Sequence, residues 1–113
     1  MRSKKQPGYL NGRHYTTYVN DVKNLKKNGL LEKAEALLIQ LVHATEEESR
    51  KEKTGVAPWY YEELAKIYRK RKDYVKEVSI LERFAKQKHA RGVGPQKLRE
   101  RLEKARVLLK NSK

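Results

Sequence analysis

The sequence predicts an all-α fold, and three observations support this prediction. Apolar residues recur at helical spacing along most of the chain after Tyr15. Gly29 stands where a first helix is expected to stop, and Pro58 stands where a third is expected to start. No segment alternates apolar and polar residues for long enough to form a convincing strand. We therefore expect two antiparallel helical hairpins followed by a C-terminal capping helix.

The first hairpin is expected to begin at Tyr15, where an apolar stripe starts, and its first helix should end before Gly29. The second helix follows from Leu30, and it is apolar on more than one face, so it should pack on two sides. The charged stretch at residues 49–54 has no apolar anchor and precedes Gly55. It predicts a frayed helix end and a loop.

The second hairpin is expected to begin at Pro58, which suits the first turn of a helix. Asp73 is a good N-cap for the fourth helix, which should end near residues 89–94. Pro95 opens a fifth helix that is apolar on one face only. The 113 residues fit one domain of ordinary size. We expect a flexible basic arm at residues 1–13, a single helical domain at residues 14–110, and a tail at residues 111–113.

The two hairpins repeat one another at a spacing of 43 residues, with Gly29 aligned to Lys72. Here the sequence resembles the tetratricopeptide repeat over roughly residues 15–86. The residues that carry the resemblance in the second hairpin are Tyr61, Leu64, Ala65, Tyr68, Lys72-Asp73-Tyr74 and Leu81. Tyr18, Leu25, Gly29, Ala34 and Leu38 carry it in the first. The chain departs from the motif at Glu77, where the family has a small residue, and at Asp21, where it has leucine.

The composition favours a polyanionic partner. The chain has 28 Lys and Arg residues against 14 Asp and Glu residues, for a net charge of +14. This exceeds the magnitude of about 2–8 that keeps a small domain soluble. There is no cysteine, which excludes disulfides, thiol catalysis and Cys-ligated metals. No apolar run approaches a membrane span and the N-terminus has no signal-peptide pattern, so we expect a cytoplasmic protein without a membrane partner.

The sequence offers little chemistry for catalysis or for binding a metal or cofactor. His43 and Glu47 have the i, i+4 spacing of two metal ligands, but no third ligand accompanies them. The serines have no nucleophile elbow, and the glycines at 92 and 94 lack the Walker lysine. We therefore expect a protein that is not an enzyme and has no cofactor or metal site.

The leading hypothesis is a protein-interaction module that binds an acidic protein or peptide. The tetratricopeptide resemblance implies that the first helix of each hairpin lines a groove. The residues expected to contact the partner there are Lys23, Lys27, Trp59, Tyr60, Lys66, Arg69 and Lys70. Charge-assisted hydrogen bonds would orient an acidic segment, and the two aromatic side chains would flank it.

The alternative hypothesis is a small nucleic-acid-binding protein. Its phosphate contacts would come from the C-terminal helices and the N-terminal arm. The residues expected to make those contacts are Arg91, Lys97, Arg101 and Arg106. Assembly into a homo-oligomer stays open as a third alternative.

Overall fold

The structure, a computed structural model, describes residues 6–112 and has the all-α fold that the sequence predicts. Its five helices are α1 (Val19–Lys27), α2 (Leu31–Glu52), α3 (Pro58–Lys70), α4 (Tyr74–Ala85) and α5 (Gly94–Asn111). A 3₁₀ turn, η1 (Tyr15–Tyr18), leads into α1, so the α-helix begins four residues later than the apolar stripe indicates. Two short strands, β1 (Tyr9–Leu10) and β2 (Arg13–His14), precede it.

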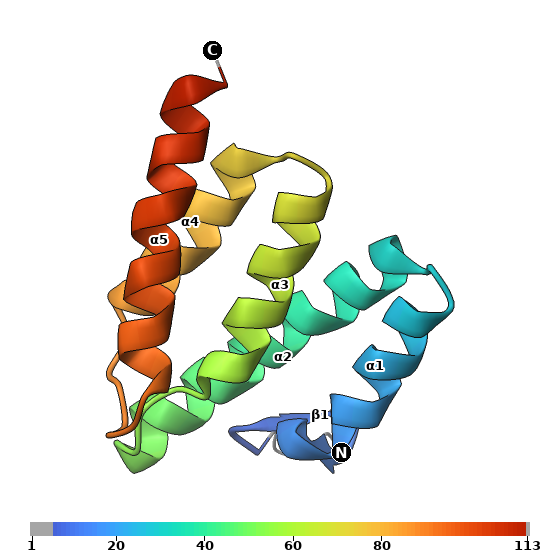
Figure 1. Ribbon diagram of the computed structural model, residues 1–113. Coiled ribbons are helices and arrows are strands. Elements are labelled where there is room, and N and C mark those ends of the chain that lie inside the picture. The colour runs from blue at the N-terminus through green and yellow to red at the C-terminus, as the bar shows by residue number, and fades with distance from the viewer. Residues whose placement is uncertain (1–5, 113) are drawn as a thin grey trace.

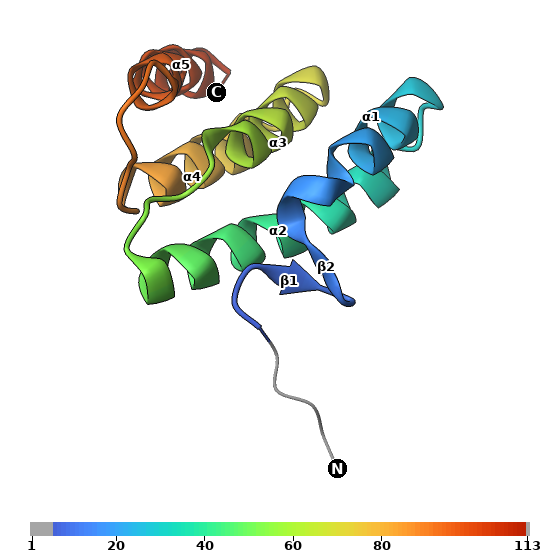
Figure 2. The ribbon, with the colours of Figure 1, turned by 90° about the horizontal axis from the view of Figure 1, so that it is seen from below.

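Consecutive helices run in opposite directions, so α1 with α2 and α3 with α4 form two antiparallel hairpins (Figure 1). Helix α5 packs against both helices of the second hairpin, α4 and α3, and caps that hairpin. The turned view in Figure 2 shows α1, α3 and α5 side by side above α2. The described chain is elongated, with principal extents of 52 × 32 × 24 Å.

Helix α3 is the centre of the core because it contacts α2, α4 and α5. Tyr61, Leu64 and Ile67 on α3 are almost completely buried, as are Leu38 on α2 and Leu81 on α4. Each buried side chain of this size contributes about 1.5–3 kcal/mol. One thin core along α3 therefore holds both hairpins together.

The two hairpin turns have the same geometry, as their 43-residue spacing suggests. In the first, Leu30 N–H donates to the Leu25 carbonyl (2.9 Å) and Gly29 N–H to the Lys26 carbonyl (3.0 Å), with Gly29 at φ +74°. In the second, Asp73 N–H donates to Tyr68 (2.9 Å) and Lys72 N–H to Arg69 (2.9 Å). This pair of bonds is the Schellman motif. Lys72 takes the left-handed conformation of Gly29, with φ +59°.

The starts of the last three helices agree with the sequence prediction. Pro58 lies in the first turn of α3, and the Asp73 carboxylate accepts a hydrogen bond from Lys76 N–H (3.1 Å) at the start of α4. Pro95 is in the first turn of α5.

The prediction of a frayed end at residues 49–54 is wrong, because α2 continues to Glu52. Thr45 and Ser49 on its last turns are buried, and the Thr45 hydroxyl accepts a hydrogen bond from Ala57 N–H (3.0 Å). The side chains that face inward here are polar, so a search for apolar residues at helical spacing does not detect this part of the helix. Lys53 ends the helix in a left-handed conformation (φ +60°).

The expected flexible arm at residues 1–13 is corrected for its described part. Residues 9–14 form a tight β-hairpin that lies against α2 (Figure 2). The Tyr18 hydroxyl donates to the Leu10 carbonyl (2.7 Å), and His14 Nε2 lies 2.6 Å from Glu48 Oε2. These contacts fix the segment to the helical body. Residues 1–5 lie outside the described residues.

The hairpins also meet where α2 ends and α4 ends, at one end of the molecule (Figure 1). Val56 N–H donates to the Lys88 carbonyl (2.9 Å), which forms a short parallel bridge between the two connections. Gly55 has φ +93°, and a Cβ atom there would lie 2.5 Å from Ala90 N. Only glycine satisfies both the backbone conformation and the close approach.

We predict that Gly55→Ala destabilises the protein by about 3 kcal/mol, because it adds a backbone clash to left-handed strain of about 1–2 kcal/mol. Gly29→Ala is the matched control, since Gly29 has a similar φ but no atom within 4 Å of the added Cβ. It should cost only about 1 kcal/mol. Urea denaturation of both variants measures the difference, and equal losses would contradict the close approach.

Candidate functional site

Four exposed lysines lie at equivalent positions of the two hairpins. Lys23 and Lys27 on α1 are separated by 43 residues from Lys66 and Lys70 on α3. In each helix the two lysines are four residues apart, so they project from one side. We call Lys23, Lys27, Lys66 and Lys70 the lysine face. Lys23, Lys27 and Lys70 form no ion pair with any other described residue.

One glutamate links the two helices that carry this face. Lys26 Nζ on α1 lies 2.5 Å from Glu63 Oε1 on α3, and Lys66 Nζ lies 3.4 Å from Glu63 Oε2. Glu63 itself is buried. The link carries one negative charge against the four lysines of the lysine face and Lys26, so α1 and α3 keep a positive excess there.

The two predicted aromatic contacts have different environments. Trp59 is partly buried and meets the Tyr60 ring edge-on, with centroids 4.9 Å apart. Tyr60 is only 3% exposed, and its hydroxyl donates to the Tyr15 carbonyl (3.1 Å). Burial raises the pKa of Tyr60 to about 12. The expectation that Tyr60 flanks a partner is therefore corrected: it is a core residue, and only Trp59 offers surface.

Arg69 and Arg101 converge on Glu77 instead of facing a partner. Glu77 is fully buried on α4. Arg69 Nε donates to both of its oxygens (2.8 and 2.9 Å), and Arg101 Nε lies 3.5 Å from Oε2. The side chains of Arg69 and Arg101 are 31% and 22% exposed. Both were expected to bind a ligand, but their charges are engaged within the fold.

Of the three remaining cations that were predicted to contact phosphate, two form ion pairs within the fold. Lys97 Nζ lies 3.0 Å from Glu62, and Arg106 Nη2 lies 3.1 Å from Glu82. Arg91 is exposed and has no ion pair within residues 6–112. Three of the four predicted cations, counting Arg101, therefore share their charge with a glutamate.

Two further glutamates at helix contacts, one buried and one partly buried, were not anticipated from the sequence. Glu46 on α2 accepts hydrogen bonds from Arg83 (2.8 Å to each oxygen) and from the Tyr61 hydroxyl (2.8 Å). Glu35 accepts from the Tyr68 hydroxyl (2.9 Å) and from Arg71 (2.6 Å). Each cluster joins α2 to the second hairpin. Carboxylates spaced 15 to 37 residues from their partners leave no local sequence signal.

The hydrogen-bond partners of Glu46 and Glu35 lower the pKa values of both carboxyl groups. Burial alone would raise the pKa of Glu46, but the hydrogen bonds from Arg83 and Tyr61 outweigh it and lower that pKa. Glu35 follows the same balance, with Arg71 and Tyr68 lowering its pKa against the effect of burial. The pKa values of Tyr61 and Tyr68 are raised by burial and by these carboxylates.

His43 lies at the edge of the Glu46 cluster, where its Nδ1 is 3.3 Å from Arg83 Nη2. Across the part of the chain that the structure describes, no three His, Asp or Glu side chains are grouped to hold a metal ion.

The end of the molecule where the hairpins meet holds a cleft that the sequence did not predict as a site. It has a volume of about 340 Å³ and is lined by Ser49, Arg50, Lys53, Lys86, Gln87 and Lys88. We call it the junction cleft. Its residues come from chain segments more than thirty positions apart, so only the tertiary fold brings them together.

Known proteins give no family assignment. No family model, curated protein or solved structure shows significant similarity to this chain. Within residues 6–112, no helix has the length and apolar character needed to cross a membrane.

We predict that Glu77→Ala destabilises the protein by about 2–3 kcal/mol, because it leaves two guanidinium groups without their shared counter-charge. This loss is smaller than the loss expected for a fully buried ion pair, because both arginines retain some solvent contact. Glu82→Ala is the control, because the Glu82–Arg106 pair is exposed and should contribute less than about 1 kcal/mol. Thermal and urea unfolding of both variants test this, and similar losses would be evidence against the central role of Glu77.

We predict that stability falls as the pH drops through the acidic range, because Glu46 and Glu35 have lower pKa values in the folded chain than in the unfolded chain. The stability that they contribute is present above the unfolded value of about 4.5 and is lost as the pH falls through the lower folded values. Urea unfolding from neutral pH downward measures this loss. In Arg83→Met, which removes the main cause of the Glu46 shift, the dependence on pH should be shallower; an unchanged slope would contradict the assignment.

Proposed function

We propose that this protein is a non-enzymatic interaction module that binds an acidic segment of a partner protein on the lysine face. The observation that carries the proposal is the placement of four exposed lysines at equivalent positions of α1 and α3. Three of them have no ion pair among the described residues. The resemblance to tetratricopeptide repeats supports the same surface, because the first helices of such hairpins line the groove.

The charge pattern supports an extended acidic ligand. The lysine pairs form two rows, one on each helix, and Glu63 joins the helices between them. Lysine ammonium groups are flexible point charges with three donors each, so they suit carboxylates at variable spacing. Trp59, at the start of α3, would add apolar contact at one end of the surface.

The arrangement of the acidic residues supports a role without catalysis. The carboxylates of Glu35, Glu46 and Glu77 are each held by an arginine at short distance. A carboxylate that is held in a fixed ion pair is poorly placed to exchange a proton with a substrate. These groups support the fold, and the exposed lysines remain available for a ligand.

The test is the binding of a fluorescein-labelled oligoglutamate peptide, followed by anisotropy. We expect the fourfold substitution Lys23→Gln, Lys27→Gln, Lys66→Gln and Lys70→Gln to weaken binding roughly thirtyfold. That figure assumes about 0.5 kcal/mol for each exposed charge contact, or about 2 kcal/mol together.

The matched control removes the same number of charges from the junction cleft with Arg50→Gln, Lys53→Gln, Lys86→Gln and Lys88→Gln. It should leave peptide affinity within about threefold of the unsubstituted protein, because only long-range attraction is reduced. If both variants lose affinity equally, net charge alone attracts the peptide and the lysine face is not its site.

A further inference from the structure

A second cationic site, separate from the lysine face, lies at the end of the molecule where the two hairpins meet. The junction cleft is lined by four cations and two neutral polar residues: Arg50, Lys53, Lys86, Lys88, Ser49 and Gln87. No acidic side chain is part of this lining. None of the four cations has an ion pair with another described residue, in contrast to Arg69, Arg101 and Arg106.

The cleft carries more positive charge than is needed to offset the dipoles of the adjacent helix ends. Lys53 and Lys86 follow the last residues of α2 and α4, and positive charge at a helix C-terminus offsets the helix dipole. Each C-terminus carries about half a negative charge, so two ends supply about one. Four full positive charges therefore leave a large excess around the cleft.

The backbone on both sides of the cleft is fixed by hydrogen bonds. Lys53 N–H donates to the Ser49 carbonyl (2.7 Å), and the Lys88 carbonyl accepts from Val56 N–H (2.9 Å). The Gln87 side chain donates to the Arg83 carbonyl (3.3 Å). The backbone positions from which the cations project are therefore fixed, so binding has to order only their side chains.

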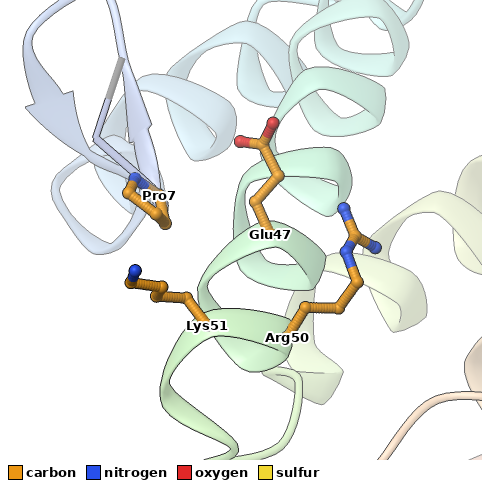
Figure 3. A pocket seen from close by; sticks show the side chains of 4 residues that line it. All are labelled: Pro7, Glu47, Arg50 and Lys51. Carbon is orange, nitrogen blue, oxygen red and sulfur yellow. The ribbon is translucent and has the colours of Figure 1, made fainter. Parts of the chain in front are cut away.

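Nearby acidic groups lie outside the cleft. Glu47 lines a neighbouring cavity of about 390 Å³ together with Pro7, Arg50 and Lys51. Figure 3 shows Lys51 reaching toward Pro7, with Arg50 on the other side of Glu47. Glu52 is exposed and lines neither cavity. Arg50 borders both cavities, so the positive surface continues beyond the junction cleft on one side. Arg91 extends the basic sequence after Lys88 on the other.

We infer that the junction cleft binds the phosphate backbone of a nucleic acid. The lining has no apolar or aromatic side chain that could anchor a peptide, and peptide recognition normally uses such anchors. Phosphate contacts need only positive charge and hydrogen-bond donors, which this lining supplies. The open, charged surface suits consecutive phosphates of a strand, and the Gln87 amide is already engaged with the Arg83 carbonyl. We therefore expect binding there to depend little on base sequence.

The experiment measures the anisotropy of labelled single-stranded RNA, single-stranded DNA and duplex DNA, each in mixed sequence, between about 50 mM and about 200 mM salt. We expect binding whose logarithm falls linearly with the logarithm of salt concentration. The variant with Arg50→Gln, Lys53→Gln, Lys86→Gln and Lys88→Gln should bind single strands at least about tenfold more weakly. Its salt slope should be smaller by two to three, since each neutralised phosphate contributes about 0.7.

Two controls separate the site from net charge and from misfolding. The variant with Lys23→Gln, Lys27→Gln, Lys66→Gln and Lys70→Gln removes the same charge elsewhere and should keep the larger slope. Lys53→Arg with Lys86→Arg retains the charge and should retain binding, and far-ultraviolet circular dichroism verifies folding of every variant. All substituted residues are exposed.

Several results would overturn the inference. One is nucleic-acid binding that is absent or insensitive to salt at about 50 mM, and another is an equal loss in the cleft variant and the lysine-face variant. Displacement of the nucleic acid by oligoglutamate at equal charge concentration would assign the cleft to an acidic protein. The proposed function of the lysine face depends on peptide binding and its own variant, so the two proposals fail independently.

Discussion

The buried carboxylate of Glu77 is the contact on which the second hairpin and the last helix depend. It brings Arg69 of α3 and Arg101 of α5 to one point on α4, so that a single side chain joins three helices. The equivalent position in the first hairpin is Ala34, which is fully buried and has no charge to match. A glutamate in a position that otherwise takes a small residue requires a counter-charge, because an unpaired buried carboxylate would be too costly. The two arginines meet this need, and α5 is thereby held against both α3 and α4.

This constraint also shapes the surface. Three carboxylates at helix contacts are held by arginine: Glu77 by Arg69, Glu46 by Arg83 and Glu35 by Arg71. Arginine suits these places because its planar guanidinium donates in a fixed fork that matches a carboxylate. These three glutamates use arginines as partners, while most lysines among the described residues are exposed and form no ion pair. The cations of the lysine face and the junction cleft therefore remain exposed and accessible to a ligand.

The sequence predicted the features that depend on local chemistry. Helix starts at Pro58 and Asp73 and the equivalent turns at Gly29 and Lys72 follow from caps and spacing. It did not predict that α2 extends through Ser49, since that turn is buried by polar contacts and carries no apolar stripe. The roles of Arg69, Arg101 and Tyr60 also required the tertiary structure: helical spacing places a side chain on a face but does not say what lies opposite. The junction cleft combines residues 49–53 with residues 86–88, and no local pattern links these segments.

The cleft exists only when the two hairpins are docked. Its walls belong to the ends of α2 and α4, and they are held together by the bond from Val56 to Lys88 and by the close approach of Gly55 to Ala90. Four like charges at this contact repel one another and oppose docking, so the junction is stabilised by backbone contacts that do not depend on charge. An anion in the cleft would remove that repulsion and bind only the docked form, and it would therefore stabilise the whole fold by linkage. The same backbone contacts explain why the short connection at residues 53–57 is tightly constrained, although its sequence carries no helical pattern and contains a glycine.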